Sequence, residues 1–310
     1  MRIAFMGTPA FAERSLERLY ADGHDIACVF TQPDKPRSRG MHVTSCPVKE
    51  LAVLHGTPVY SPLTLKDGAA ADALLKHDCE LIAVVAYGRI LPRDILELPP
   101  YGAINVHGSL LPKYRGAAPV QWAVLNGDKE TGVTTQFISE ELDSGDILFT
   151  KKTAIGEDET SGELFERLSY LSAELLSETI DAVSRGEAVP VPQDVSKVSY
   201  APMLTKEMSP IDWTETADRI KRKVCGLNPW PVATTRLGGT LYRVFRAGIG
   251  EKRENACEER KHAMRPGEIV SAGKQGIEVA CSDGTVIIKE LQVSGGKRMT
   301  AGEYLRGHRI

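Results

Sequence analysis

Asn105 and His107 stand two residues apart at the end of a short apolar run, and both carry side chains that can act on a carbonyl group. Positions i and i+2 of a strand point to the same side, so the amide and the imidazole project together beyond the strand end. An amide donor beside a titratable ring suits a carbonyl whose oxygen becomes negative during a reaction. The alternative is a polar strand end whose histidine only satisfies its neighbours, and this motif alone does not separate the two interpretations.

The acidic segment EELDSGDI, residues Glu140–Ile147, lies between β-prone runs and reads as a turn. Asp143 or Asp146 could reach over the sheet end toward His107. A carboxylate beside an imidazole fixes the tautomer of the ring. Taken alone, the segment is better explained as an acidic surface turn, so its role depends on the rest of the chain.

The elements that must position these residues alternate between strand and helix patterns over residues 1–186. We expect strands over Arg2–Gly7, Ile26–Phe30, Leu81–Ala86, Ala103–His107 and Val133–Ile138, and helices over Pro47–His55, Ala69–His77 and Ala117–Leu125. Short apolar runs separated by helices predict an α/β fold with a mainly parallel sheet covered on both faces. Ligands of such sheets lie outside the carboxyl ends of the strands, where Asn105 and His107 stand.

Helix ends can also be predicted from the sequence. Thr8 is the expected N-cap of the first helix, with Pro9 at its first position. Thr160 and Glu163 have the spacing of a capping box at the start of a long helix, and Gly186 suits its end.

Residues 187–210 carry four prolines and little periodicity, which predicts an extended linker. Beyond it we expect a helix over Thr214–Cys225 and then short β-prone runs separated by turns. This pattern fits a small antiparallel β-barrel. We therefore predict a catalytic domain over 1–186, a linker over 187–210 and a barrel over 211–310. The charged stretch Gly250–Arg265 is expected to be an exposed loop inside the barrel.

Charge is distributed unevenly along the chain. Residues 1–200 hold 19 basic and 28 acidic side chains, whereas residues 201–310 hold 19 basic and 13 acidic ones, so their net charges are -9 and +6. The basic C-terminal third could meet an anionic partner, or it could be a solvated surface. The loop Thr31–Cys46 has little sign of regular structure and carries Lys35, Arg37 and Arg39, so it is either a basic finger or an ordinary surface loop.

Several functional classes are disfavoured. The six cysteines are scattered without the spacing of a zinc site, which fits reduced thiols in a cytoplasmic protein. The N-terminus lacks the apolar core of a signal peptide, and no apolar run is long enough to cross a membrane. MGTPAFA lacks the GxGxxG fingerprint, and no phosphate-cradling P-loop is found.

The motifs MGTPAF, TQPDKPRSRG, VVAYGRILP, NVHGSLLPKYRGAAPVQWA, LDSGDI and IDW…NPWPVA occur in this order along nearly the whole chain. Together they resemble the methionyl-tRNA formyltransferases. The HxSLLPxxRG core is shared with glycinamide ribonucleotide and sugar N-formyltransferases, so it identifies the chemistry better than the acceptor. The basic finger and the basic C-terminal region point to tRNA as the acceptor.

The resemblance implies a Rossmann-like domain followed by a small OB-like barrel that binds tRNA. It implies transfer of the formyl group of 10-formyltetrahydrofolate, without a metal, to the α-amino group of initiator methionyl-tRNA. By position, it implies catalytic roles for Asn105, His107 and Asp143. It assigns folate binding to Ser109, Leu110, Leu111 and Pro112, with Tyr87 and Gly88 as a wall of the pterin pocket. It assigns tRNA contacts to Arg39 and Lys206.

Met41 and His42 follow Arg39 where family members often carry two lysines, so the loop has fewer charges than usual. Further candidate contacts to tRNA, some of which would be solvated surface charges, are Lys221, Arg222, Lys223, Lys297 and Arg298. The remaining alternatives are the same chemistry on a nucleotide-sugar amine and a non-catalytic RNA-binding protein. The sequence carries no direct sign of oligomeric state, and we expect a monomer.

Overall fold

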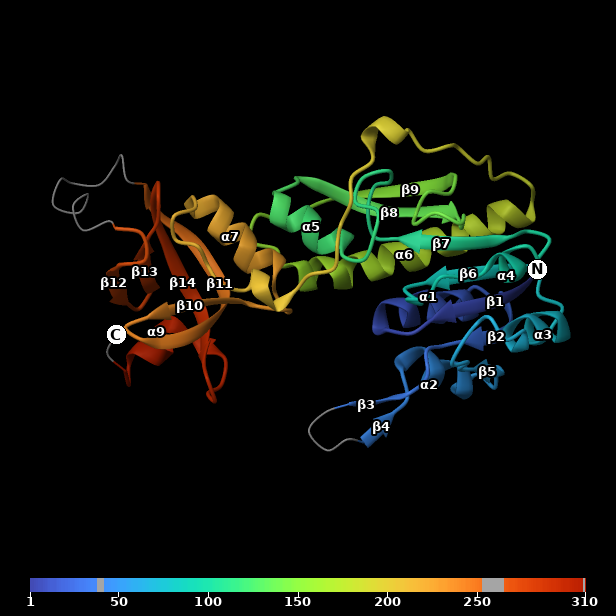
Figure 1. The fold of residues 1–310 in the computed structure, drawn as a ribbon, viewed down its shortest axis with the longest axis horizontal. Helices are drawn as coiled ribbons and strands as arrows, with labels where there is room; N and C mark the ends of the chain where they lie inside the picture. Colours follow the sequence, from blue (N-terminus) through green and yellow to red (C-terminus); the bar gives the residue numbers. More distant parts are fainter. Residues whose placement is uncertain (38–41, 253–264, 309) are drawn as a thin grey trace. The chain divides into compact units, whose positions relative to one another are not determined.

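The computed structural model describes residues 1–37, 42–252, 265–308 and 310 (Figure 1). These residues form two compact units that are not continuous in sequence. The first unit holds residues 1–119, 131–153 and 165–201, and the second unit holds residues 120–130, 154–164 and 202–310. The sheet that carries Asn105 and His107 belongs to the first unit.

The sheet of the first unit has seven strands in the order β5-β2-β1-β6-β7-β8-β9. Their bounds are β1 Arg2–Gly7, β2 Asp25–Phe30, β5 Val59–Tyr60, β6 Leu81–Val85, β7 Ala103–His107, β8 Glu130–Phe137 and β9 Ile147–Ala154. Strands β5, β2, β1, β6 and β7 pair in parallel, and β8 runs antiparallel to β7. The predicted, mainly parallel sheet is therefore confirmed.

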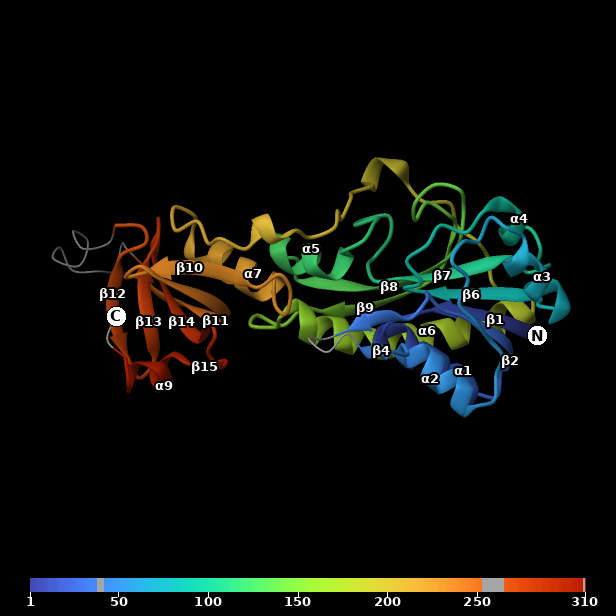
Figure 2. The same ribbon diagram turned by 60° about the horizontal axis from the view of Figure 1, so that its bottom comes forward.

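Helices cover both faces of this sheet, as a parallel sheet with buried strands requires. They are α1 Ala10–Ala21, α2 Pro47–Leu54, α3 Ala69–Lys76, α4 Arg93–Leu96 and α6 Ser161–Ser184. Helices α3 and α4 pack in one hydrophobic cluster with Ala4, Met6, Ile82 and Val84, whereas α1 and α6 lie on the opposite side (Figure 2). All five residues of β6 are buried, which explains their continuous apolar run.

Two predicted features of the N-terminal region are wrong. Helix α1 begins at Ala10 with Pro9 as its N-cap, because the Thr8 hydroxyl accepts a hydrogen bond from the Gln32 N–H at 3.1 Å instead of capping the helix. The loop expected over 31–46 contains a hairpin of β3, Lys35–Arg37, and β4, His42–Thr44. A two-stranded ribbon has two edges, so it tolerates the prolines that suggested a loop.

Helix α6 is the long helix that the sequence predicts. The Glu163 N–H donates to the Thr160 hydroxyl at 3.3 Å, and the Thr160 N–H donates to the Glu163 carboxylate at 2.9 Å. This is the predicted capping box. Gly186, with a φ of 69°, lies two residues after the last helical residue, Ser184, and so provides the left-handed residue that commonly ends a helix.

The chain after α6 is irregular but well anchored to the first unit. We call residues 187–201 the post-helix segment. Val191 and Ile147 exchange two backbone hydrogen bonds of 2.8 and 2.9 Å. Further along, Arg115 donates to the Ser199 carbonyl and accepts from the Ala201 N–H, both at 2.8 Å. A single helical turn, η1 Val195–Lys197, interrupts the segment.

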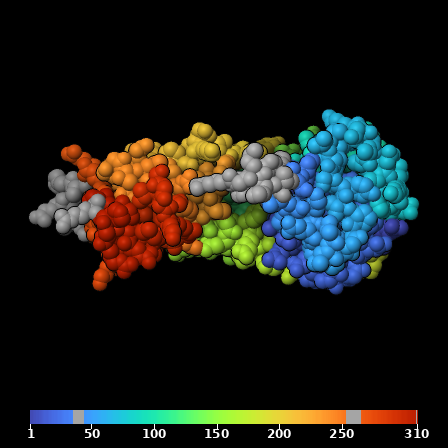
Figure 3. Space-filling model, turned by 90° about the horizontal axis from the view of Figure 1, so that it is seen from below, coloured from blue at the N-terminus to red at the C-terminus, as the bar shows by residue number. Residues whose placement is uncertain are grey.

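The second unit contains an antiparallel sheet in the order β10-β11-β14-β13-β12, with β15 paired to β14. The bounds of its elements are α5 Pro119–Asn126, η2 Lys206–Met208, α7 Ala217–Gly226, β10 Ala233–Leu237, β11 Thr240–Lys252, β12 Ile269–Gly273, β13 Gly276–Ala280, β14 Gly284–Val293, β15 Met299–Thr300 and α9 Ala301–Leu305. The sheet, α7 and α9 share one hydrophobic cluster, which includes Ile220, Val244, Ile288 and Tyr304. The predicted antiparallel β domain is confirmed, and its residues are coloured orange to red in Figure 3.

Helix α7 starts three residues later than predicted. Asp212 accepts hydrogen bonds from the backbone N–H and the hydroxyl of Thr214, which holds Thr214 in a turn. The N-cap is Thr216, whose hydroxyl accepts from the Arg219 N–H at 3.3 Å. Most of the predicted loop Gly250–Arg265 lies outside the described residues, and β11 already extends to Lys252. Within the described part of the chain, no helix is both long and apolar enough to span a membrane.

Candidate active site

Strand β7 brings Asn105 and His107 to the carboxyl end of the sheet, between β6 and β8. Asn105 pairs with Val84 on one side and with Gln136 on the other, and His107 pairs with Thr134. The Asn105 side chain is partly exposed and makes no hydrogen bond to any residue that the structure describes. Its amide is therefore available to a ligand.

The His107 ring is 6 % exposed, and the protein holds it at one nitrogen. Nε2 lies 2.8 Å from the backbone oxygen of Tyr114. A carbonyl oxygen can only accept, so Nε2 must carry a hydrogen, and this contact fixes the orientation of the ring. Nδ1 is the nitrogen that remains for chemistry.

Asp143 faces that second nitrogen. Its Oδ2 atom lies 3.6 Å from His107 Nδ1 and accepts a hydrogen bond of 2.8 Å from the Gly116 N–H. Asp143 has a φ of 48°, a left-handed conformation that aspartate tolerates better than most residues. The structure thus brings Asp143 to the imidazole, whereas Asp146 uses its backbone oxygen to accept from the Phe137 N–H.

The turn after β7 holds the four residues to which the family resemblance assigns folate binding. Ser109 and Leu111 are buried. The Ser109 hydroxyl donates to the Lys113 carbonyl at 2.6 Å, and the Ser109 carbonyl accepts from the Thr134 hydroxyl at 2.7 Å. Leu110 and Pro112 remain partly exposed. Ser109 and Leu111 therefore shape the turn, and Leu110 and Pro112 keep surface that a ligand could touch.

Three residues near Asp143 are missing from the sequence prediction: Gln136, Gln193 and Arg115. The Gln136 amide lies 3.4 Å from Asp143 Oδ1. Gln193 donates from Nε2 to the backbone oxygens of Asp143 and Gly145, both at 2.8 Å. Gln136 belongs to a run of polar residues in the strand β8, and such a run could have marked it as a site residue in the sequence. Gln193 lies in an aperiodic segment, 50 residues from Asp143, so no local pattern marks it.

Tyr87 lies after β6, as expected, but its side chain is 1 % exposed and belongs to the hydrophobic cluster with α3 and α4. Burial raises the pKa of its phenol. Gly88 follows with a φ of 74°, and a Cβ there would approach Gln32 Nε2 to 2.7 Å. The role of Tyr87 and Gly88 as a wall of the pterin pocket therefore stays a prediction.

The residues predicted to contact tRNA differ in their surroundings. Lys206 lies exposed in η2, and Arg39 lies outside the described residues. Lys221 is 8 % exposed and pairs with Asp158 at 2.7 Å, Arg222 pairs with Asp218, and Lys223 donates to the Pro210 carbonyl. The run 221–223 is therefore engaged within the second unit.

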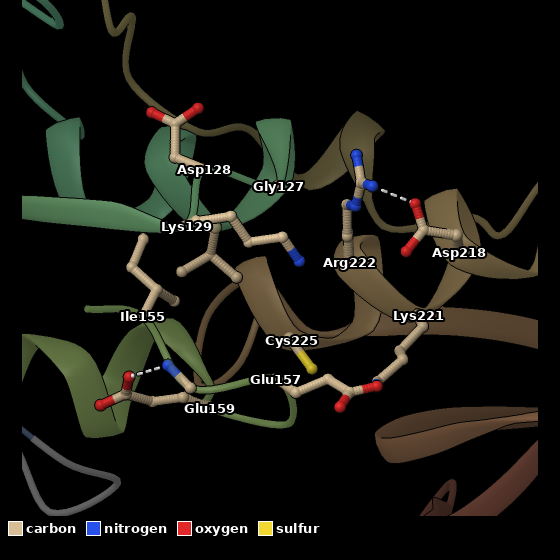
Figure 4. A pocket seen from close by; sticks show the side chains of 12 residues that line it. Gly127, Asp128, Lys129, Ile155, Glu157, Glu159, Asp218, Lys221, Arg222 and Cys225 are labelled. Atoms are coloured by element: carbon tan, nitrogen blue, oxygen red, sulfur yellow. Dashed lines mark hydrogen bonds and ion pairs between the residues drawn. The ribbon is translucent and has the colours of Figure 1, made fainter.

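A pocket of about 200 Å³ lies in the second unit between α7, the end of α5 and the turn after β9. Figure 4 shows Arg222 directed toward Asp218, with Lys129, Glu157, Glu159 and Lys221 around the same space. None of its lining residues belongs to the cluster around His107. In the described ranges, no group of three or more His, Cys, Asp or Glu side chains is arranged to hold a metal ion, and the cysteines there are free thiols.

Comparison with known proteins places this geometry in a family. The model of the formyl transferase family matches residues 1–180, and that of the formyl transferase C-terminal domain matches residues 203–309. Methionyl-tRNA formyltransferase of Pelotomaculum thermopropionicum is 47% identical over 99% of this chain and 96% of its own length. The chain belongs to the methionyl-tRNA formyltransferase family. The relative from Citrifermentans bemidjiense is 45% identical over 100% of this chain and 94% of its own.

Solved structures related to this methionyl-tRNA formyltransferase family member share its fold at low identity. HypX from Aquifex aeolicus, in complex with tetrahydrofolic acid, is 19% identical with a TM-score of 0.63, over 98% of this chain and 47% of that one. The N-formyltransferase of Helicobacter canadensis, in complex with folinic acid and dTDP-3-aminofucose, is 16% identical with a TM-score of 0.66, over 92% and 98% of the two chains.

Proposed function

We propose that this protein transfers the formyl group of 10-formyltetrahydrofolate to the α-amino group of methionyl initiator tRNA. Membership of the methionyl-tRNA formyltransferase family supports the reaction and the acceptor. The structural observation that carries the proposal is the pairing of His107 with Asp143, 3.6 Å apart, on the strand whose Asn105 amide has no hydrogen-bond partner among the described residues.

The donor set at the sheet end fits a formamide. A partly exposed amide and a ring nitrogen stand together where the oxygen of such a group could meet both. When bound, 10-formyltetrahydrofolate supplies an activated formyl group, whose bond to the folate nitrogen breaks as the acceptor amine bonds to the formyl carbon. Leu110 and Pro112, the partly exposed members of the turn after β7, are the residues we propose to touch the folate.

Each residue has a distinct proposed role. Asn105 donates its amide N–H to the formyl oxygen as negative charge develops there, and one such donor is typically worth about 3–4 kcal/mol in the transition state. Because Nε2 of His107 is held by Tyr114, the ring acts through Nδ1, which as N–H is a second donor to that oxygen. Asp143, which faces Nδ1 at 3.6 Å, helps to move the proton that the amine loses, through water, toward the leaving nitrogen.

For the acceptor, we propose that residues 211–310 bind the tRNA backbone and that Arg39 and Lys206 approach the acceptor stem. The net charge of +6 over residues 201–310 and the exposure of Lys206 support this role. Residues 1–186 would then form the catalytic domain and residues 187–210 the connection to the tRNA-binding domain. We further propose that the enzyme acts in the cytoplasm as a monomer, which sedimentation of the purified protein would test.

The deciding experiment is a formyl-transfer assay with 10-formyltetrahydrofolate and three acceptors: methionyl initiator tRNA, methionyl elongator tRNA and a nucleotide-linked amino sugar. We expect rapid formylation of the initiator tRNA alone. Transfer only to the amino sugar would replace the proposed acceptor, and binding of tRNA without any transfer would indicate a non-catalytic RNA-binding protein. Comparison of wild type with Arg39→Ala and Lys206→Ala on the initiator tRNA then tests the two proposed contacts, because unchanged activity and discrimination would remove them from the interface.

A further inference from the structure

We infer that Gln193 is a positioning residue for catalysis, which acts by holding the backbone of Asp143 against His107. This inference rests on the proposed function, because it assumes that Asp143 takes part in formyl transfer. Gln193 lies in the post-helix segment, residues 187–201, where the sequence suggests only a linker.

The Gln193 amide bridges two parts of the first unit. Its Nε2 atom donates to the backbone oxygens of Asp143 and Gly145, both at 2.8 Å, and to the side-chain oxygen of Gln136 at 3.0 Å. Its Oε1 atom accepts two hydrogen bonds from the Arg115 guanidinium, from Nε at 3.1 Å and from Nη2 at 2.7 Å. Arg115 is 7 % exposed, and it makes no ion pair with any residue that the structure describes. The oxygen and the nitrogen of the Gln193 amide thus both have partners, which fixes the orientation of the amide group.

The turn around Asp143 needs such support. Asp143 is in the left-handed region, which costs free energy for a residue other than glycine and persists when the surroundings fix it. Gln193 binds the backbone oxygens of Asp143 and Gly145, the two residues that flank Ser144. One amide therefore holds the turn at Asp143 and directly after it. The chain is also tight at Gly145, where a Cβ would lie 1.8 Å from the Phe137 carbonyl oxygen.

The same segment supports His107 from the other side. The Ser199 hydroxyl accepts from the Tyr114 N–H at 3.0 Å, and the Tyr114 carbonyl in turn accepts from His107 Nε2. The Gly116 N–H, next to Arg115, donates to Asp143 Oδ2. A Cβ at Gly116 would lie 2.8 Å from the Ala201 oxygen, so the loop and the segment are in close contact. The post-helix segment therefore sets the positions of both partners of the His107–Asp143 pair.

Loss of the Gln193 amide should misplace Asp143 without removing any group that touches a substrate. A misplacement of about 1 Å can cost about 10²-fold in rate. For Gln193→Ala we expect kcat to fall by about 10- to 100-fold, with little change in the KM for either substrate. Asp194→Ala is the matched control, because Asp194 is the next residue, lies exposed and contacts only Ser196 and Lys197 of η1 in the described chain, so kcat should not change.

The test is a double-mutant cycle that measures kcat and KM of wild type, Gln193→Ala, Asp143→Ala and the double variant. If Gln193 acts through Asp143, the Gln193 change should lower kcat by less than about threefold when Asp143 is already absent. An equal loss in both backgrounds, or no loss in wild type, overturns the inference. If Gln193→Ala does not fold, the same criteria apply to Gln193→Glu, which keeps the acceptor for Arg115 and loses the donor to Asp143.

Failure of the proposed function would look different. A wild-type enzyme that does not formylate methionyl-tRNA, or an Asp143→Ala variant with wild-type kcat, contradicts the function or its site before Gln193 is considered. A strong Asp143 effect together with full activity of Gln193→Ala contradicts only the role of Gln193.

Discussion

Nδ1 of His107 faces Oδ2 of Asp143 at 3.6 Å, while Nε2 of the same ring is 2.8 Å from the Tyr114 carbonyl oxygen. The protein therefore holds one nitrogen with its backbone and leaves the other opposite a carboxylate. The distance between ring and carboxylate leaves room for both to turn slightly toward a substrate, as apo sites often require.

Asp143→Ala should lower kcat by about 10²- to 10⁴-fold, the usual range for a group that assists proton transfer. Initial rates of formyl transfer to methionyl-tRNA measure the effect, and circular dichroism verifies the fold. Asp146→Ala is the matched control: Asp146 lies three residues further on and contributes a backbone oxygen, which the substitution keeps. Equal rates for wild type and Asp143→Ala would exclude Asp143 from the chemistry.

Asn105→Ala should lower kcat by about 10²- to 10³-fold, because it removes a donor to the developing oxyanion. Its Tm should stay close to that of wild type, since the amide has no hydrogen-bond partner in the described chain. Asn105→Asp keeps the shape but presents a negative charge to the oxyanion, so it should be at least as slow. Full activity of Asn105→Asp would contradict the donor role.

The ion pair of Lys221 and Asp158 should stabilise the second unit only over a limited range of pH. The hydrogen bond from Lys221 lowers the pKa of Asp158 below 3.8; burial opposes the charge of Lys221, but its contact with Asp158 leaves its pKa above 10.5. The contribution of Asp158 is present above pH 3.8 and is lost as the pH falls through its lowered pKa. The contribution of Lys221 is present below pH 10.5 and is lost as the pH rises through its raised pKa.

Thermal unfolding of Lys221→Met from about pH 3 to about pH 11 tests this window. The variant should be less stable than wild type near neutrality, by no more than about 1 kcal/mol since Asp158 is largely exposed, and the difference should shrink toward both extremes. Lys274→Met, at an exposed lysine, should follow wild type throughout. A difference that does not vary with pH would mean that Lys221 acts by packing.

Thr160→Ala should destabilise the start of α6 by about 1 kcal/mol, because it removes the hydroxyl of the capping box. For a folded unit of about 150–250 residues, that loss corresponds to a decrease in Tm of about 2–4 °C. Thr160→Ser keeps the hydroxyl and should restore most of the stability. If both variants unfold like wild type, the capping box contributes nothing measurable.

The parts of the fold that depend on local pattern could be predicted from the sequence. Ala103–His107 is a short apolar run with a polar end, so its bounds and the common direction of Asn105 and His107 follow from a period of two. The hairpin of β3 and β4 was missed because prolines and a glycine suggest a loop. The start of α7 was missed because two threonines could cap it, and only the contact of Asp212 with Thr214 decides between them.

The candidate site was predictable only in part, for a related reason. The choice between Asp143 and Asp146 depends on how the turn after β8 folds, which the left-handed conformation of Asp143 determines. Gln193 and Arg115 form a hydrogen bond although they are 78 residues apart in the sequence, and neither lies in a helix or strand. Contacts of this kind arise from the packing of the whole unit and leave no local pattern.

The internal contacts of Lys221, Arg222 and Lys223 bear on how a polyanion would be bound. A cation that is already neutralised by a carboxylate displaces few condensed counterions when a phosphate approaches, and the gain in counterion entropy is correspondingly small. The 19 basic side chains of residues 201–310 would then overstate the number of counterions released, so a plot of log affinity against log salt concentration should be shallower than that number suggests.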